Sequence, residues 1–213
     1  KKLKFRKFSS NLLREKFDLI VIALSLSGID FIGKQLKILK LKTPILVLTK
    51  GLKYHKKNNK ILTISEQLKN NYNSMNISVL KGPCLAKELA RKKQTSVIIA
   101  SKNIKIAKWI GKMISTKYYI IEYSKDIIGV EVCSAIKNIY AMIIGTGQSL
   151  NTSSSLFQKS IIEMKYLTKY FKGKEPTTLG LAGVGDLYVS AAGGRNSKMG
   201  SYLGKGFTFK NAK

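Results

Sequence analysis

The sequence predicts an α/β fold, a mostly parallel sheet with helices on its faces, followed by an all-helical region. Two observations support this prediction. Between residues 17 and 123, short apolar runs alternate with helical patterns, as they do where crossover helices join buried parallel strands. After Asp126 the strand patterns stop, and the rest is typical of helices joined by glycine-rich loops. We therefore expect one domain over residues 1–125 and a second over residues 126–213.

Five apolar runs are predicted to be strands, at residues 17–24, 45–48, 77–80, 96–100 and 118–123. Apolar residues at helical spacing predict helices between them, near residues 29–39, 61–71, 85–92 and 106–114. Pro44 marks the entry to the second strand, and Gly82-Pro83 marks a turn after the third. In the second helix, Ser65 is expected to face outward.

The first helix of the second domain, at about residues 127–144, has two distinguishable faces. An apolar stripe at helical spacing is predicted to be the buried face: Ile128, Val132, Ala135, Ile139 and Ile143. Lys137 falls on the opposite face, among Val130, Cys133 and Ala141. From these residues alone two interpretations stay open. Lys137 is either a solvated surface lysine or a lysine that faces a cleft.

Length and composition narrow the class of protein. A chain of 213 residues can bury a proper core in one large or two small domains. No run reaches the ~18 uninterrupted apolar residues of a membrane span, so we expect no transmembrane segment. The basic residues at positions 1–7 are not followed by an apolar region with a cleavage site. We therefore expect no signal peptide and a cytoplasmic location.

Metal and histidine chemistry are not expected. Cys84 and Cys133 are the only cysteines and His55 is the only histidine, which leaves no spacing for a structural zinc site or a disulfide framework. A Ser-His-Asp arrangement is equally implausible, since His55 lies in a polar run. Any proton transfer must therefore use a lysine, a tyrosine or a carboxylate.

The formal net charge of +28 raises the alternative of a basic, nucleic-acid-associated protein. Two features weaken it. Only four of the 39 basic residues are arginine, and the lysines are spread along the whole chain. Lysine, isoleucine and asparagine are all abundant, which is typical of a codon-composition bias. We expect no specific nucleic-acid partner, because net charge bears on non-specific association and not on chemistry.

Residues 180–196 form the most informative segment, because they place one carboxylate and one guanidinium among five glycines. Gly193 and Gly194 allow backbone N–H groups to approach a ligand oxygen, and Arg195 offers a planar fork that fits phosphate. Asp186 would repel an anion here unless a cation lies between, so we expect a lysine partner for it. The alternative is a simple glycine turn beside a surface arginine.

Four segments in order carry a resemblance to a known family: residues 49–52 (T-K-G-L), 82–88 (G-P-C-L-A-K-E), 129–138 (G-V-E and A-I-K-N) and 181–196. Together they resemble NAD(P)-dependent glycerol-3-phosphate dehydrogenase of the bacterial type, and the resemblance covers nearly the whole chain. It implies a Rossmann-type NAD(P)-binding domain followed by a helical domain of the 6-phosphogluconate-dehydrogenase type, with substrate held between them. It also implies reduction of dihydroxyacetone phosphate to sn-glycerol 3-phosphate, which feeds glycerophospholipid synthesis.

By this resemblance, Lys137 matches the catalytic lysine of the family, Lys50 matches a lysine that contacts substrate and cofactor, and Asp186 orients both. Positions that match substrate-binding residues are Lys50, Gly82, Cys84, Lys137, Asn138, Asp186, Gly194, Arg195 and Asn196. Positions that match cofactor contacts are Lys50, Ala86 and Arg195. NAD and NADP both stay open as the cofactor, and a homodimer is compatible with the resemblance.

The chain departs from the family pattern in three ways. Cys84 stands where bacterial members usually have serine, and Leu85 stands where they have phenylalanine. No G-x-G-x-x-G dinucleotide fingerprint occurs anywhere in the sequence. The chain is therefore interpreted as a fragment of the family's fold, and a fragment with no activity of its own is a second alternative to the dehydrogenase.

Overall fold

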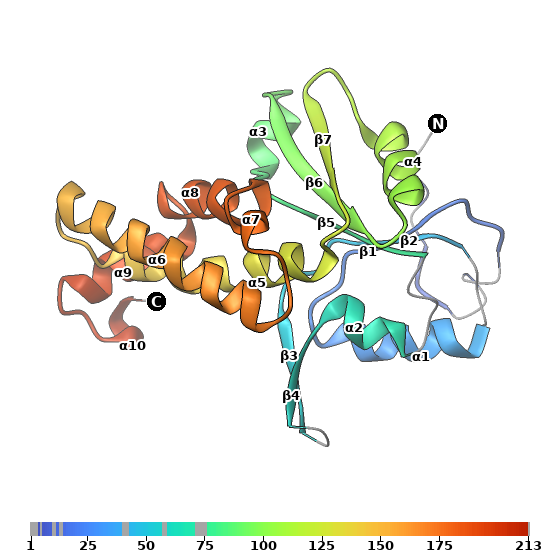
Figure 1. Ribbon diagram of the computed structural model, residues 1–213, viewed down its shortest axis with the longest axis horizontal. Helices are drawn as coiled ribbons and strands as arrows, with labels where there is room; N and C mark the ends of the chain where they lie inside the picture. Colours follow the sequence, from blue (N-terminus) through green and yellow to red (C-terminus); the bar gives the residue numbers. More distant parts are fainter. Residues whose placement is uncertain are drawn as a thin grey trace.

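The structure is a computed structural model, and it describes residues 4, 6–9, 12, 15–39, 43–56, 59–70 and 76–212 (Figure 1). Within these residues, five strands form one sheet in the order β1-β2-β5-β6-β7. Their bounds are β1 Ile20–Ile22, β2 Ile45–Val47, β5 Ile77–Lys81, β6 Thr95–Ser101 and β7 Tyr119–Ser124. Each lies within a residue or two of a predicted strand, except that β1 is shorter than the predicted run.

Helices accompany the strands and then replace them. The helices that lie between strands in the chain are α1 Gly28–Leu39, α2 Ile64–Lys69, α3 Ala86–Ala90 and α4 Ile104–Ile114. The helices after β7 are α5 Ile127–Gly145, α6 Leu150–Tyr170, α7 Glu175–Thr178, the π-helical turn η4 Leu181–Gly185, α8 Asp186–Ala191, α9 Arg195–Gly204 and α10 Phe209–Ala212. The predicted fold class, an α/β sheet followed by helices, is confirmed. The domain boundary at residues 125 and 126 stays a prediction.

The sheet is mostly parallel, as predicted, with one exception. The pairs β1–β2, β2–β5 and β6–β7 are parallel, but β5 and β6 are antiparallel. After β5 the chain passes through the short helix α3, turns, and returns alongside β5 as β6. Antiparallel strands need no long crossover helix between them, and α3 has only five residues.

The prediction of a helix over residues 61–71 is partly wrong. The chain first forms a two-stranded antiparallel hairpin, β3 (Leu52–His55) and β4 (Lys60–Thr63), and the helix begins only at Ile64. The start is fixed by a capping box between Thr63 and Glu66, and the predicted end at Asn71 lies outside the described residues. Ser65 is buried, not exposed as predicted, because it bonds to a carboxylate of α5.

Helix α5 buries a different face from the predicted one. Ile139 and Ile143 of the predicted stripe are 56% and 37% exposed, while Cys133 and Ala141 are completely buried. The reason is that α5 is apolar nearly all round and is enclosed by several neighbours, so apolar spacing alone cannot identify its inner face. By length and composition this helix could cross a membrane, but 67% of the relevant window is buried inside the protein, as in a core helix.

In Figure 1, α5 lies between the sheet and a group of helices formed by α6, α8 and α9. Its start is fixed by Asp126, whose Oδ1 accepts a hydrogen bond from the Gly129 N–H at 3.0 Å. The other carboxylate oxygen accepts from the Lys174 N–H at 2.8 Å, which ties the chain before α7 to the same point. The main hydrophobic core includes residues of β1, β2, β5 and α5, so it joins the sheet and the helices.

Candidate functional site

Three charged side chains from three separate parts of the chain meet beside α5. Lys50 follows β2, Lys137 lies on α5, and Asp186 begins α8. The Lys50 Nζ donates to Asp186 Oδ2 at 2.8 Å, and the Lys137 Nζ donates to Asp186 Oδ1. Asp186 is 2% exposed and Lys137 is 7% exposed, whereas Lys50 is exposed. A buried carboxylate therefore holds two ammonium groups, one of them open to solvent.

The main chain around Lys50 is fixed from both sides. Thr49 Oγ1 donates to the Leu24 carbonyl at 2.8 Å and accepts from the Leu24 N–H at 3.2 Å, which joins the ends of β1 and β2. Gly51 follows with φ of +139°, a conformation that other residues rarely adopt. Lys50 thus lies at a sharp turn just past the carboxyl end of β2.

Asp186 is brought to the site by the π-helical turn η4. In this turn a Cβ on Gly183 would lie only 1.9 Å from the Thr178 carbonyl oxygen, so the close packing requires glycine. Single π-turns of this kind occur frequently at functional sites. The glycines of the predicted anion segment therefore have at least one purely structural task, which is to place the Asp186 carboxylate.

Ser190 joins the lysine group to the start of α9. Its Oγ accepts from Lys137 Nζ at 2.7 Å and donates to the Asp186 carbonyl at 2.7 Å. One turn later, the Gly194 N–H donates to the Ser190 carbonyl at 3.0 Å. Sequence reasoning missed Ser190, although its position four residues after Asp186 on one helix face was a usable signal.

The electrostatics of Lys137 suit proton exchange. Burial is the largest effect and lowers the pKa of Lys137; the Asp186 carboxylate raises it, and the ammonium of Lys50 lowers it further. The balance leaves the pKa of Lys137 below its ordinary value. A lysine whose pKa is lowered exchanges its proton more readily than a surface lysine.

Two further buried charges were missed from the sequence. Lys81, the last residue of β5, donates through Nζ to the Thr49 carbonyl at 2.6 Å and to the Val47 carbonyl at 3.3 Å. Glu131 on α5 accepts from the Ser65 N–H at 3.0 Å and from the Ser65 hydroxyl. Burial lowers the pKa of Lys81 to about 8 and raises the pKa of Glu131. In the sequence, Glu131 is a single charge inside an apolar run, and Lys81 directly follows one.

The other predicted residues at the end of β5 are placed close to this group. Gly82 is buried, has φ of +116°, and a Cβ there would lie 3.3 Å from the Val97 Cα. Cys84 and Ala86 follow at the surface. Burial raises the pKa of the Cys84 thiol, and the nearby Lys50 ammonium opposes that rise. Cys84 therefore lies within electrostatic range of Lys50.

The remaining predicted residues make no direct contact with the lysine group. Within the described part of the chain, no hydrogen bond or ion pair joins Arg195, Asn196 or Asn138 to Asp186 or to its two lysines. Arg195 and Asn138 are exposed, and Asn196 is half-buried at the start of α9. Their roles stay predictions.

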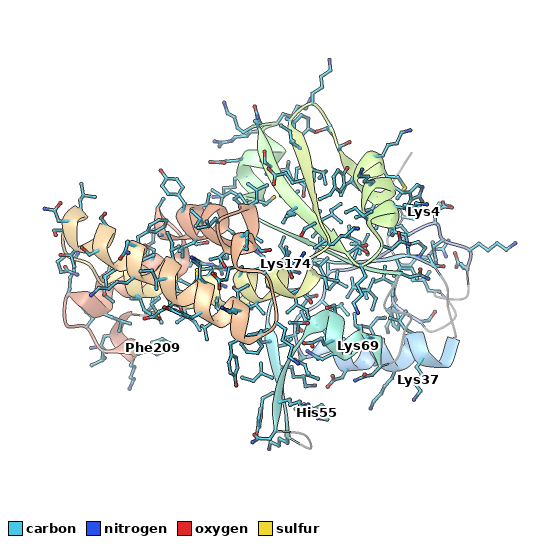
Figure 2. All side chains as sticks on the ribbon, in the orientation of Figure 1. Lys4, Lys37, His55, Lys69, Lys174 and Phe209 are labelled. Atoms are coloured by element: carbon cyan, nitrogen blue, oxygen red, sulfur yellow. The ribbon has the colours of Figure 1, made fainter. Side chains whose placement is uncertain are left out.

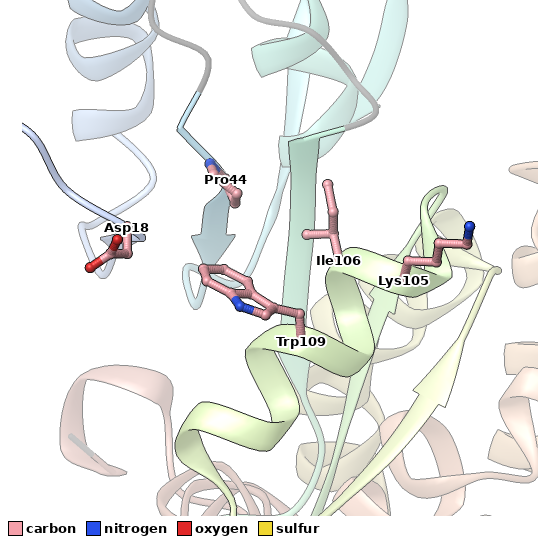
Figure 3. A pocket seen from close by; sticks show the side chains of 5 residues that line it. All are labelled: Asp18, Pro44, Lys105, Ile106 and Trp109. Carbon is pink, nitrogen blue, oxygen red and sulfur yellow. The ribbon is translucent and has the colours of Figure 1, made fainter.

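Other features that could bind a ligand lie elsewhere. A cavity of about 340 Å³ is lined by Asp18, Pro44, Lys105, Ile106 and Trp109 (Figure 3). Asp18 and Pro44 precede β1 and β2, so this cavity is at the amino ends of those strands, whereas ligands of open α/β sheets bind at the carboxyl ends. His55 is at the end of the β3 strand, in a hairpin that projects from the molecule (Figure 2).

Lysines lie over different parts of the molecule, as the labelled Lys4, Lys37 and Lys174 show in Figure 2. Among the residues that the structure describes, no three His, Cys, Asp or Glu side chains lie close enough together to hold a metal ion. The buried group of lysines and carboxylates is therefore the strongest candidate for chemistry.

Comparison with known proteins points to one family. Residues 9–107 match the family description "NAD-dependent glycerol-3-phosphate dehydrogenase N-terminus", and residues 126–213 match "NAD-dependent glycerol-3-phosphate dehydrogenase C-terminus". A glycerol-3-phosphate dehydrogenase [NAD(P)+] from Clostridium botulinum is 33% identical over 205 residues, which cover 93% of this chain and 61% of the relative. An NADP(+)-dependent glycerol-3-phosphate dehydrogenase from Archaeoglobus fulgidus is 31% identical over 79% of this chain and 53% of the relative.

Solved structures show the same relationship. The crystal structure of glycerol-3-phosphate dehydrogenase from Coxiella burnetii has a TM-score of 0.81 and 30% identity, covering 92% of this chain and 61% of that one. The yeast enzyme has a TM-score of 0.80 at 22% identity, over 92% of this chain and 60% of that one, and supports the fold alone. The Rossmann-type fold class is confirmed, and the alternative of a nucleic-acid-associated protein finds no support in these comparisons.

The chain spans about three fifths of the length of the curated relatives it matches. Within that span, the two family matches cover both the sheet and the helical part and leave only short segments outside. The segments that carry Lys50, Lys137 and Asp186 fall inside these matches. The chain therefore belongs to the NAD-dependent glycerol-3-phosphate dehydrogenase family.

Proposed function

We propose that this protein interconverts dihydroxyacetone phosphate and sn-glycerol 3-phosphate with NAD or NADP, and that the reductive direction supplies glycerophospholipid synthesis. The observation that carries this proposal is the buried Asp186 carboxylate with Lys50 and Lys137 on its two oxygens. Residues 1–125 would hold the cofactor side of the site and residues 126–213 the catalytic lysine. A cytoplasmic location and a homodimer stay predictions.

In the proposed reaction, Lys137 is the acid. When a hydride adds to the C2 carbonyl carbon, the π electrons move to the carbonyl oxygen, and the Lys137 ammonium donates a proton to that oxygen to form the hydroxyl group. In the oxidative direction the Lys137 amine accepts that proton. The lowered pKa of Lys137 supports both directions, and Asp186 with Ser190 orients its Nζ.

The ends of β2 and β5 offer a main chain that fits the cofactor. Gly51 and Gly82 both have positive φ just past β2 and β5, where a side chain on Gly82 would be held against Val97. Such bare backbone suits the approach of a flat ring, and Lys50, Ala86 and Arg195 would hold that end of the cofactor. NAD(P)H supplies the hydride when bound. The pyrophosphate fingerprint G-x-G-x-x-G is not among the 213 residues.

The phosphate of the substrate would bind at the start of α9. Gly194 is the N-cap of this ten-residue helix, and a Cβ there would lie 2.4 Å from the Ser190 carbonyl oxygen. The free N–H groups of the first turn and the Arg195 guanidinium together favour a dianion. Because Ser190 also contacts Lys137, a bound phosphate would place the carbonyl of a three-carbon substrate toward that lysine.

Lys137→Met tests this proposal. We expect kcat to fall by about 10²-fold or more, because the general acid is lost, while glycerol 3-phosphate still binds. Turnover is measured by NAD(P)H absorbance, and binding by isothermal titration calorimetry. Lys165→Met is the matched control, since Lys165 is a partly exposed lysine on α6 that contacts neither Asp186 nor Lys50 in the described residues, and its kcat should equal that of the wild type. Near-normal turnover of Lys137→Met would refute the assignment.

A further inference from the structure

Lys81 occupies the point where β2 leaves the sheet. In the parallel pairing of β2 and β5, Ile45 lies opposite Ile77 and Val47 opposite Val79, so the same register places Lys81 opposite Thr49. Backbone pairing stops before this position. The Lys81 ammonium continues it by donating to the carbonyls of Val47 and Thr49, the latter of which belongs to the peptide bond that leads into Lys50.

Burying a lysine at this position is energetically unfavourable. Lys81 is 2% exposed, and an ammonium loses much solvation when it is buried. An apolar side chain would avoid that cost, as it does at Ile77 and Val79, which are buried and alternate with Ser78 and Leu80 along the same strand. Buried charged groups whose pKa is shifted are found most often at functional sites.

The surroundings of Lys81 connect it to the site. The groups that act on its charge are the Glu131 carboxylate on α5, the Lys50 ammonium after β2, and the Asp186 carboxylate on α8. Asp186 in turn holds Lys137. Within the described residues no ion pair joins Lys81 to Glu131, so Lys81 is held by backbone carbonyls and acts on the others through space.

We propose that Lys81 is a positioning residue of this site: its ammonium fixes the segment that carries Lys50, and its charge makes the affinity for a phosphate dianion depend on pH. The proposal rests on the proposed function, because it takes the Lys50 and Lys137 group to be the place where the phosphorylated substrate binds. Lys81 itself contacts neither substrate nor cofactor. It acts through its hydrogen bond to the backbone of Thr49 and through the electrostatic effect of its charge near Lys50.

The sign of the pH effect follows from the burial of Lys81. Burial is the largest influence on the pKa of Lys81 and lowers it to about 8; Glu131 opposes this, and Lys50 adds to it. Below that pH the group is a cation and strengthens the binding of an anion, and above it the group is a neutral amine. A phosphate monoester has a second pKa of about 6, so it is about 90% dianionic at pH 7 and nearly all dianionic at pH 8, and its own titration changes little across pH 8.

The experiment compares the wild-type chain with Lys81→Met and Ser101→Ala. Ser101 is the matched control because its buried hydroxyl also donates to a backbone carbonyl of β5, that of Ile77, but at the other end of the strand. Affinity for glycerol 3-phosphate is measured by calorimetry from pH 7 to pH 9.5. Amide hydrogen exchange of residues 48–52 is measured on the same samples, and thermal melting confirms that each variant folds.

We expect three results. The wild-type affinity falls across pH 8. Lys81→Met binds about tenfold more weakly at pH 7, the size of effect of one lost charge-assisted hydrogen bond, and its affinity shows no fall near pH 8. Its amides at residues 48–52 exchange faster, while Ser101→Ala keeps the wild-type affinity, pH profile and exchange in that segment. A Lys81→Met variant with the wild-type pH profile, or a Ser101→Ala variant that loses it, overturns the proposal.

A second variant covers the case in which Lys81→Met does not fold. Glu131→Gln removes the attraction that keeps Lys81 protonated, so the fall in affinity should move to lower pH, and an unmoved fall overturns the proposal. Failure of the proposed function looks different: the wild type then binds neither glycerol 3-phosphate nor inorganic phosphate at any pH. In that case amide hydrogen exchange is the remaining test of the positioning role. Unchanged exchange at residues 48–52 in Lys81→Met rejects that role.

Discussion

Two sets of buried charge lie against α5, and they are held in opposite ways. In the first, Asp186 takes two ammonium groups directly, one of them from Lys137. In the second, Glu131 is held by the N–H and hydroxyl of Ser65, and Lys81 is held by backbone carbonyls. Both carboxylates are 2% exposed, so the difference does not come from burial. The difference comes from the groups that each charge contacts, which are opposite charges in the first set and neutral hydrogen-bonding groups in the second.

The difference teaches what each set can do. Opposite charges in direct contact stabilise one another, and removing one member leaves a buried charge without compensation. Charges held by neutral dipoles are each satisfied locally, and their strongest effect is on the backbone they bind. The first set is therefore suited to act on a ligand, and the second to hold the main chain that carries the first.

Asp186→Asn gives the largest expected effect and would break the first set. The free energy of unfolding should fall by about 3 kcal/mol at neutral pH, because Lys137 would keep a buried charge with no carboxylate beside it. The loss should shrink as pH rises, since Lys137 can then release its proton. Chemical denaturation at several pH values measures this.

Glu131→Gln is the matched comparison for Asp186→Asn. The amide oxygen can still accept from Ser65, and the buried negative charge, whose burial raises the pKa of Glu131, is gone. We expect a change within about 1 kcal/mol. Equal losses in the two variants would show that the partnering described above does not control stability.

The pH dependence of stability sharpens the comparison through Lys81. The folded chain releases the Lys81 proton near pH 8, whereas the unfolded chain holds it to about 10.5. Between these values the unfolded state binds more protons, so the stability of the wild type should rise relative to Lys81→Met, by about 3 kcal/mol over the whole window. Parallel stability curves for the two proteins from pH 7.5 to 10 would contradict this.

Arg195→Lys tests an exposed cation against the buried ones. The substitution keeps the charge but removes the planar fork, so we expect the affinity for glycerol 3-phosphate to fall about tenfold with little change in kcat or in melting temperature. Lys198→Arg, one turn further along α9, serves as the control and should bind normally. An unchanged KM for Arg195→Lys would place the phosphate elsewhere.

The smallest effect is expected at a surface group of charges. Glu175 lies 3.3 Å from Lys169, which is exposed, and 3.7 Å from Lys165, which like Glu175 is partly exposed. Solvent screens such pairs, so Glu175→Gln should change the free energy of unfolding by less than about 0.5 kcal/mol. A larger loss that disappears in 1 M salt would show that this surface network contributes more than its exposure suggests.

Local patterns were enough to predict most of the sheet and the helices that flank it. The apolar run at residues 96–100 and the helical spacing at residues 29–39 each lie within a single element. Neighbouring residues alone are therefore enough to predict that element. The hairpin β3–β4 was missed because its strands, Leu52–His55 and Lys60–Thr63, have only four residues each, which is too short for a periodic pattern to stand out. The direction of β6 was missed because it is set by pairing with β5 and not by the apolar run itself.

The site was harder to predict from sequence, for a physical reason. Lys50, Lys137 and Asp186 were identified from the family resemblance, since periodicity left Lys137 open between surface and cleft. Lys81 and Glu131 were not identified, because their burial depends on tertiary packing around α5. A charged residue within an apolar run predicts burial only when the partner that satisfies it is known, and Thr49 and Ser65 are distant in sequence.

The reversal between β5 and β6 determines how far α5 must travel. Because β6 and β7 run opposite to β5, the chain enters α5 beside the beginning of β5, where Ile127 and Ile77 line one small cavity. Ten residues later, after a rise of about 15 Å, the helix delivers Lys137 to the other rim of the sheet. The number of residues between the start of α5 and Lys137 therefore fixes where the ammonium lies. One residue inserted between Ile127 and Lys137 would turn the ammonium by about 100° and point it away from Asp186.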